Sequence, residues 1–297
     1  MTQDLKPVVV IVGSLHYDII VEAPDRPRKG ETVTGHAWRP KFGGKGGNQA
    51  VAAARAGADS RMWGAVGDDD FGRFLLAALD RGAVDASRVA VLPGTGSGMS
   101  VAIADSEGDY GAVIVSGANL LADQGGLADA GLWQGARALI LQNEMPEALN
   151  LSAALQARAA GALVCLNAAP FRPLSDDFET LIDVLIVNAI EAEQSGGGEV
   201  ADLDAAATAA AHLAARFPCV VVTAGGDGVA GVWQGGTPVV LPALPVDLVS
   251  THGAGDMFVG TLVTVLARGE DFADALDAAN RAAAEHVSAR PDADPQG

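Results

Sequence analysis

Short runs of consecutive apolar residues alternate along this chain with longer Ala-rich stretches of helical periodicity. Residues 8–13 (VVVIVG) form a continuous apolar run, which is typical of a strand buried on both faces of a parallel sheet. Runs of the same kind occupy 61–67, 138–141, 162–167, 184–188 and 219–225. The stretches with helical periodicity occupy 48–58, 68–83, 147–161 and 202–217. This order predicts an α/β fold with a mostly parallel, doubly wound sheet flanked by helices on both faces.

Two segments interrupt the alternation of strands and helices. Residues 18–44 contain turn residues and short alternating strands without helical periodicity, and residues 96–119 are typical of a hairpin that turns at 106–108. Together they predict a small antiparallel β flap on the main sheet. The chain has no internal repeat, linker or low-complexity segment, and we therefore expect residues 1–297 to form a single domain.

The balance of charge argues against some classes of partner. The 297 residues include 37 acidic and 19 basic residues, for a net charge of −18, which disfavours binding to nucleic acid or to an anionic membrane. No apolar run reaches the length of a transmembrane helix, and the N-terminal residues lack the pattern of a signal peptide. Cys165 and Cys219 lie in apolar runs, as buried free thiols do. We expect a soluble cytoplasmic protein.

Polar residues follow most of the predicted strands. In open parallel sheets, ligands bind beyond the carboxyl ends of the strands, where such residues meet. Each of these residue types is also common in ordinary turns, so it is their number at one edge that indicates a site. The positions are Asp18, 43–48, Asn143, Glu144, Asn167, 188–191, 223–228 and 253–256.

The last of these positions carries the clearest chemistry. Gly253, Ala254 and Gly255 leave backbone N–H groups at the start of a predicted helix open to an anion. An acid in the same turn, Asp256, repels an anion unless it accepts a proton from a hydroxyl while the anion is held beside it. Transfer of a phosphoryl group to an alcohol needs this combination. The alternative is that Asp256 only caps the helix.

Three other motifs each allow a ligand or a structural role. Lys45 and Asn48 offer donors in a glycine-rich loop, which is not a Walker A motif because Lys45 is followed by two glycines. Asn188 and Glu191 stand three residues apart at a strand-to-helix junction, a spacing that suits hydrated Mg²⁺ and a phosphate, or a helix cap. Residues 220–229 run from a strand into a glycine turn, which suits nucleotide phosphates or a hairpin.

Taken together, these stretches resemble the ribokinase family, the phosphofructokinase-B type of carbohydrate kinases. The likeness covers nearly the whole chain, and its two specific signatures are the Gly-Gly motif at 43–50 and the Gly-Ala-Gly-Asp motif at 253–256. Other segments in the family's order are GSLHYDIIV, KGETVTG, GDDDFG, NAAP, VNAIEAE and TAGGDGV. Within the family, GGKGGNQA is most similar to the ribokinase branch. The resemblance implies a ribokinase-like fold and ATP-dependent transfer of the γ-phosphoryl group to a primary hydroxyl of a small sugar, a ribose-like pentose or a ketohexose.

The resemblance also implies roles for individual residues. Asp256 matches the general base, and the amides of Gly253, Ala254 and Gly255 match the anion hole. The positions that hold the sugar are matched by His16, Asp18, Gly44, Lys45, Asn48 and Glu144. Asn188 and Glu191 match the motif that arranges Mg²⁺ and the phosphates, and Glu191 matches the residue nearer the metal. The positions that contact ATP are matched by Thr223, Ala224, Gly225, Gly226, Asp227, Gly228 and Asn280. The lid, 18–44 and 96–119, matches a flap that also forms the contact of a homodimer.

Departures from the family pattern change two of these expectations. His16 stands where ribokinases carry Asn, so the sequence leaves open whether ribose is the acceptor. Ser250 stands where an acid usually precedes the signature, and the chain ends without the family's glycine-containing loop. Both changes fall where many members bind a monovalent cation, and we expect weak or no dependence on K⁺. His252 can place an imidazole there, and a protonated ring would itself supply positive charge.

Two other functions stay open on the sequence. A nucleoside kinase of the same family has a flap that admits a base, and a non-catalytic sensor of sugar or nucleotide has the same fold without turnover. Lys45 and the ribose-type flap favour a sugar kinase. The presence of Asp256 after a full Gly-Ala-Gly motif disfavours a sensor, because a sensor needs no base.

Overall fold

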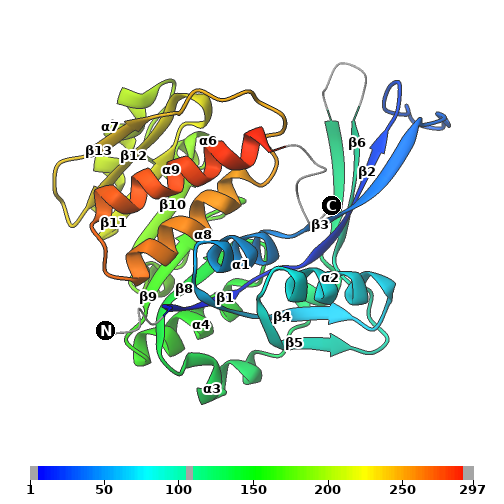
Figure 1. Cartoon of the computed structure of the whole chain (residues 1–297), viewed down its shortest axis with the longest axis horizontal. Coiled ribbons are helices and arrows are strands. Elements are labelled where there is room, and N and C mark those ends of the chain that lie inside the picture. The colour runs from blue at the N-terminus through cyan, green and yellow to red at the C-terminus, as the bar shows by residue number, and fades with distance from the viewer. Residues whose placement is uncertain (1–5, 105–109, 290–297) are drawn as a thin grey trace.

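In the computed structural model, which describes residues 6–104 and 110–289, helices cover both faces of a nine-stranded sheet, and a four-stranded sheet projects from one end (Figure 1). The strands of the large sheet are β1 (Val8–Val12), β4 (Asp59–Gly67), β5 (Asp85–Leu92), β8 (Ala136–Gln142), β9 (Leu163–Asn167), β10 (Val184–Asn188), β11 (Cys219–Thr223), β12 (Gly228–Trp233) and β13 (Val239–Pro242). Their order is β13-β12-β11-β10-β9-β8-β1-β4-β5. The strands from β11 to β5 are parallel, and only β12 and β13 are antiparallel to their neighbours, so the predicted sheet is confirmed.

The helices form one layer on each face of this sheet. They are α1 (Lys45–Arg55), α2 (Asp70–Arg81), α3 (Ala130–Trp133), α4 (Glu147–Ala159), α5 (Asp176–Glu179), α6 (Ala189–Gln194), α7 (Leu203–Leu213), α8 (Ala254–Ala267) and α9 (Phe272–Ser288), with 3₁₀ turns η1 (Gly117–Leu120), η2 (Gln124–Ala128) and η3 (Gly225–Asp227). Because side chains alternate across a strand, Ile11 belongs to the hydrophobic cluster that includes α1, α2, α8 and α9, whereas Val10 and Val12 belong to the cluster on the other face, which includes α3 to α7. In the described residues, no helix is long and apolar enough to cross a membrane.

The start of α1 differs from the prediction. The helix begins at Lys45 rather than at residue 48, because Gly46 and Gly47 form its first turn instead of preceding it. An added Cβ at Gly46 would lie 2.6 Å from the carbonyl carbon of Gly13, so the missing side chain lets this turn pack directly on the end of β1. Gly44 precedes the helix with a φ of 87°, a left-handed conformation that favours glycine. The backbone N–H of Lys45 is thereby directed at the edge of the sheet where the strands end.

The projecting sheet, which we call the lid, consists of β2 (His16–Glu22), β3 (Ala37–Gly43), β6 (Met99–Ala104) and β7 (Tyr110–Val115) in the order β3-β2-β6-β7. The pairs β2–β3 and β6–β7 are antiparallel, as predicted, but the central pair β2–β6 is parallel. Each of these two strands leaves the end of the large sheet and starts its own hairpin, so the two run in the same direction. The predicted turn at 106–108 lies outside the described residues.

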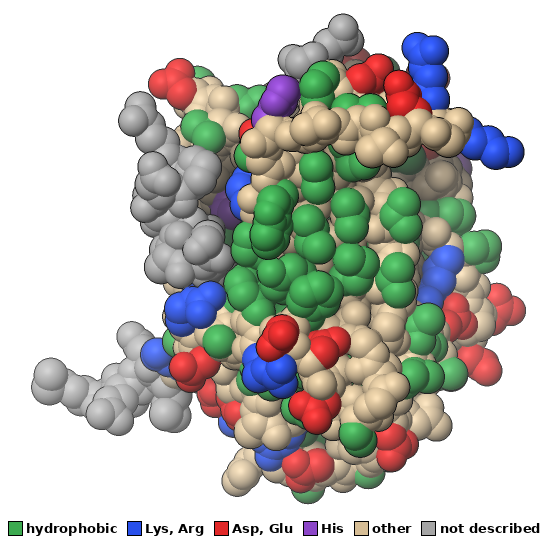
Figure 2. Space-filling view, turned by 90° about the vertical axis from the view of Figure 1, so that its right-hand side faces the viewer, with side chains coloured by type: hydrophobic (Ala, Val, Ile, Leu, Met, Phe, Trp, Pro, Cys, Tyr) green, Lys and Arg blue, Asp and Glu red, His purple; other side chains and the backbone are tan. Residues whose placement is uncertain are grey.

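The two faces of the lid have opposite character. Asp18 pairs in register with Lys41 and Ser100, and these residues share the face on which the polar site lies. The other face carries the alternate residues Ile19, Val21, Trp38, Pro40, Val101, Val113 and Val115. Seen from the lid side, the molecule shows hydrophobic side chains gathered over this sheet (Figure 2). At the base of the lid, the ring of Tyr17 stacks on Phe71 of α2 with centroids 4.0 Å apart, which covers only that end of the apolar face.

Candidate active site

The first turn of α8 presents open backbone N–H groups beside a buried acid. Gly253 precedes the helix in the left-handed conformation, with a φ of 86°, and Asp256 is only 8% exposed. The imidazole Nε2 of His286 lies 3.0 Å from the carbonyl oxygen of His252, which ties the loop before α8 to α9. A Cβ added at Gly255 would meet no atom within 4 Å, because this residue faces an open cleft. Ala254 N donates to the Thr251 carbonyl at 3.3 Å, so the part of this turn that lies open to an anion beside Asp256 is the face at Gly255.

The carboxylate of Asp256 is held by two amide donors from α1. Asn48 Nδ2 donates to Oδ2 at 3.0 Å, and Gln49 Nε2 donates to Oδ1 at 2.9 Å. Burial raises the pKa of Asp256, while the charge of Lys45 and the two amide hydrogen bonds oppose that rise. A carboxylate with a raised pKa is a stronger base than one in water. The two amides thus hold the carboxylate of Asp256 in one orientation beside the first turn of α8.

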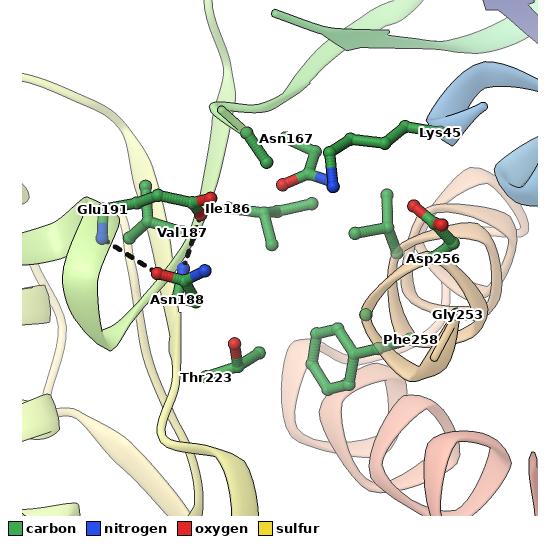
Figure 3. A pocket seen from close by; sticks show the side chains of 13 residues that line it. Lys45, Asn167, Ile186, Val187, Asn188, Glu191, Thr223, Gly253, Asp256 and Phe258 are labelled. Carbon is green, nitrogen blue, oxygen red and sulfur yellow. Dashed lines mark hydrogen bonds between the residues drawn. The ribbon is translucent and has the colours of Figure 1, made fainter. Parts of the chain in front are cut away.

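The cleft brings together predicted residues from distant parts of the chain (Figure 3). Lys45 and Asp256 lie on one side, and Asn188 and Glu191 lie on the other, with Thr223 at the end of β11 between them. The remaining lining residues include Asn167, Gly253, Gly255 and Phe258. These groups come from the ends of β9, β10 and β11 and from the starts of α1, α6 and α8, as expected for a site at the carboxyl edge of a parallel sheet.

A second polar group lies between the lid and α1. Glu144 Oε2 accepts a hydrogen bond from Lys45 N at 2.9 Å and another from the Ser14 hydroxyl, and the Nδ1 atom of His16 lies 4.0 Å away. The His16 ring is 4% exposed, and its Nε2 atom has no hydrogen-bond partner among the described residues. These contacts bring His16, Lys45 and Glu144 together, and an added Cβ at Gly44 would lie 2.7 Å from the backbone nitrogen of His16.

Asp18 lies on the polar face of the lid, where the Ser100 hydroxyl donates to its Oδ1 atom. Burial raises the pKa of Asp18, against the effect of this hydrogen bond. A Cβ at Gly43 would lie 1.9 Å from Asp18 Oδ2, so only glycine fits opposite this carboxylate. The close approach explains why the Gly-Gly motif and Asp18 occur together. It also turns the carboxylate toward the space between the lid and α1.

Asn188 and Glu191 form the helix cap that the sequence allowed. Asn188 N donates to Glu191 Oε2 at 2.9 Å, and Glu191 N donates to Asn188 Oδ1 at 2.8 Å, so the two residues cap α6 reciprocally (Figure 3). The pair also lines the cleft, and burial raises the pKa of Glu191. Within the described ranges, no three His, Cys, Asp or Glu side chains cluster as a complete metal site. This donor set fits Mg²⁺, which is commonly held by one or two carboxylates together with phosphates and waters.

The structure places only some of the residues predicted to contact the nucleotide at the cleft. Thr223 lines the cleft, and the turn from Ala224 to Gly228 closes with a hydrogen bond from Ala224 N to Gly228 O at 2.8 Å. Asn280 of α9 instead donates from Nδ2 to the Pro242 carbonyl at 2.9 Å and is not among the residues that line the cleft. Its observed contact is a structural one that ties α9 to the end of β13.

His252, in the loop before α8, does not supply the positive charge that a protonated imidazole would place there. Although much of this residue is exposed, desolvation of the imidazole and then the charges of Lys41 and Lys45 lower the pKa of His252 to about 4. The ring is therefore neutral at pH 7. Ser250 Oγ accepts a hydrogen bond from His252 N at 3.3 Å, and Ser250 N donates to the Val287 carbonyl at 3.1 Å. The last residues of the chain, 290–297, lie outside the described ranges.

The sequence patterns did not reveal four side chains that support this site. Ser14 and Ser100 hold Glu144 and Asp18, and Gln49 and Gln142 lie fully buried behind Asp256. A signal for Gln49 was present, because an amide immediately after Asn48 interrupts the apolar pattern of α1 on a side that packs against another helix. Gln142 gives a similar signal at the end of an apolar strand.

Both the sequence and the structure of this chain are similar to those of known carbohydrate kinases. Residues 6–295 match the pfkB family of carbohydrate kinases. The chain is 36% identical over 263 residues to ribokinase from Mus musculus, which covers 87% of this chain and 81% of that protein. It is 32% identical over 290 residues to ribokinase from Haemophilus influenzae, with 96% and 93% covered. The structure of Arabidopsis thaliana ribokinase complexed with ribose and ATP has a TM-score of 0.89 at 28% identity and covers 96% of this chain and 94% of that one.

Proposed function

Because this chain belongs to the pfkB family of carbohydrate kinases and is an ATP-dependent kinase of the ribokinase type, we propose that it phosphorylates a primary hydroxyl of a small sugar with Asp256 as the general base. The observation that supports this role is the buried carboxylate of Asp256, oriented by Asn48 and Gln49 and adjacent to the open N–H groups of α8. No other described carboxylate combines these features. The acceptor is a ribose-like pentose or a ketohexose.

In the proposed reaction, Asp256 accepts the proton of the sugar hydroxyl as that oxygen bonds to the γ-phosphorus of ATP. The N–H groups of Gly253, Ala254 and Gly255 stabilise the negative charge on the transferred phosphoryl group, and the positive end of α8 adds to this effect. Lys45 lines the same cleft and places its charge near the phosphates. The bond from the γ-phosphorus to ADP breaks, and the proton remains on Asp256 until solvent removes it.

The sugar is held from two sides. Asp18 and His16 approach it from the lid, and Gly44, Lys45, Asn48 and Glu144 approach it from α1 and the end of β8. Support for this assignment comes from the burial of His16 and Asp18 and from the link between Lys45 N and Glu144. Buried polar groups discriminate strongly among ligands, because a wrong ligand leaves them unpaired. His16 therefore determines which sugar is accepted.

ATP lies on the opposite side of the cleft in this proposal. Thr223 and the turn from Ala224 to Gly228 contact it, and Asn280 supports this turn indirectly, because it donates to the carbonyl of Pro242, which pairs with Gly228. Mg²⁺, when bound with the phosphates, neutralises their charge, and Asn188 and Glu191 are the residues that would hold it through oxygen atoms. The reciprocal cap between these two residues fixes their side chains in advance.

Asp256→Asn tests the proposed base, since it keeps the size of the side chain and removes the proton acceptor. Loss of a general base lowers the rate by a factor on the order of 10² to 10⁴, and we expect kcat with D-ribose and ATP to fall within this range. Asp274→Asn, which changes an exposed acid in the first turn of α9, is the matched control. Near-native turnover of Asp256→Asn would contradict the assignment. A panel of pentoses, ketohexoses and nucleosides identifies the acceptor, and preference for a nucleoside would favour a nucleoside kinase.

A further inference from the structure

A chain of two buried glutamines leads from the end of β8 to Asp256. We infer that Gln49, oriented by Gln142, is a positioning residue that fixes the carboxylate of Asp256 for proton transfer. This inference rests on the proposed function, because it takes Asp256 as the base. The two glutamines come from segments that are far apart in the sequence, and neither lines the cleft where the substrates bind.

The direction of the hydrogen bonds carries the inference. Gln142 Nε2 donates to Gln49 Oε1 at 2.7 Å, and Gln49 Nε2 donates to Asp256 Oδ1 at 2.9 Å. A side-chain amide has one donor end and one acceptor end. Because Gln142 donates to the oxygen of Gln49, the nitrogen of Gln49 must face the carboxylate. With the amide reversed, two oxygens would face each other at Asp256, and two nitrogens would face each other at Gln142.

Gln142 is itself fixed by the ends of two strands. Its side chain lies directly over Gly13, where an added Cβ would be only 2.1 Å from Gln142 Oε1. Asn150 Nδ2 donates to the backbone carbonyl of Gln142 at 2.8 Å, which anchors the start of α4 to the same residue. Gly13 is therefore glycine because the amide of Gln142 occupies the space of a side chain. Packing against Gly13 thus confines the Gln142 side chain, although its Oε1 atom has no hydrogen-bond partner among the described residues.

The two amides that hold Asp256 have different surroundings. Asn48 is partly exposed and lies among the residues that we assign to the sugar, so an incoming hydroxyl can replace its hydrogen bond to Oδ2. Gln49 is completely buried and holds Oδ1 whether or not a sugar is bound. Gln49 therefore keeps the carboxylate in place at the moment when the hydroxyl approaches Oδ2.

Removal of Gln49 has a consequence that a general loss of packing does not. A hydrogen bond donated to a carboxylate favours its ionised form. Without the Gln49 donor, burial of Asp256 acts with less opposition and raises its pKa further. The acidic limb of the pH–rate profile then moves to higher pH, because the base must be ionised to accept a proton.

The test compares Gln49→Met, Gln142→Met and the double variant with Ser60→Ala as a matched control. Ser60 is also buried and donates to the Ala50 carbonyl of the same helix, but it has no link to Asp256. The carboxyl group of Asp256 is titrated by ¹³C NMR in the absence of substrates, and kcat and KM are measured with D-ribose and MgATP across pH. We expect Gln49→Met to raise the pKa of Asp256 by about one pH unit. We also expect it to lower kcat about tenfold with little change in KM, a smaller loss than removal of a base causes.

Gln142→Met should produce a smaller shift in the same direction, and the double variant should match Gln49→Met alone, since Gln142 acts through Gln49. If Gln49→Met does not fold, the shift in Gln142→Met decides the question. An unshifted titration of Asp256 in the variants that fold overturns the inference, and additive shifts in the double variant overturn the orienting role of Gln142. Near-native turnover of Asp256→Asn would instead overturn the proposed function and leave the NMR result standing.

Discussion

The contact between α1 and α8 depends on Gly260, one turn after Asp256. A Cβ at this position would lie 2.5 Å from the Cβ of Ala52, 2.7 Å from the backbone nitrogen of Ala53 and 2.7 Å from the carbonyl oxygen of Gln49. Ordinary contact distances require the two helices to separate by about 1 Å in Gly260→Ala. The hydrogen bond from Gln49 to Asp256, now 2.9 Å, would then exceed the range of effective hydrogen bonds.

The cost of Gly260→Ala in stability follows from two opposing effects. Overpacking of a core costs about 1–3 kcal/mol, and alanine in a helix interior recovers about 0.5–1 kcal/mol relative to glycine. We expect the free energy of unfolding, measured by urea titration, to fall by about 0.5–2 kcal/mol, and kcat to fall by about tenfold or more as the carboxylate loses its partner.

Gly96→Ala is the matched control for this experiment. Gly96 is exposed, and the nearest atom to its added Cβ would be Asp69 Oδ2 at 3.9 Å, an ordinary contact. This variant should keep both stability and turnover. If Gly260→Ala unfolds and turns over like the wild type, close helix contact does not set the geometry at Asp256, and the reasoning is refuted.

Three further predictions concern the cation, the assembly and the acceptor. We expect initial rates in K⁺, Na⁺ and a bulky organic cation to agree closely at constant ionic strength, because Ser250 lacks the charge of a carboxylate; activation of tenfold or more by K⁺, about 1.4 kcal/mol of barrier, would contradict this. We propose a homodimer through the apolar face of the lid, so light scattering should show a dimer. Val113→Lys should convert this dimer to a monomer, whereas Leu155→Lys, a change at an exposed residue of α4, should leave it intact. A monomeric wild type would refute the proposal. His16→Asn should shift preference toward D-ribose, and an unchanged order of preference across the sugar and nucleoside panel would exclude His16 as the determinant.

The positions of the central strands along the chain could be predicted because their residues are apolar on both faces. β5, β12 and β13 escaped prediction, since β5 is an exposed edge strand interrupted by charges and β12 contains two glycines. The parallel pairing of β2 with β6 depends on where both strands leave the large sheet, which no local pattern records.

Some residues of the candidate site could likewise be predicted from the sequence, and others could not. Gly253 to Asp256 could be identified because a bare helix start beside an acid has a specific chemical use. Gln49 and Gln142 could not be connected, since their hydrogen bond joins residues 93 positions apart. Asn280 was assigned through the family pattern, and only the folded chain reveals its bond to Pro242. Local chemistry is thus readable from sequence, whereas partners brought together by packing are not.

The contacts of Asp256 also constrain when this protein becomes active during its synthesis. Its partners Asn48 and Gln49 lie 208 and 207 positions earlier in the chain. A nascent chain on the ribosome therefore completes the lid and α1 long before it contains α8. Contacts of such long range form late in folding. A truncated translation product that retains the lid would still carry the acceptor-side residues but would have no base, so incomplete chains should not consume ATP.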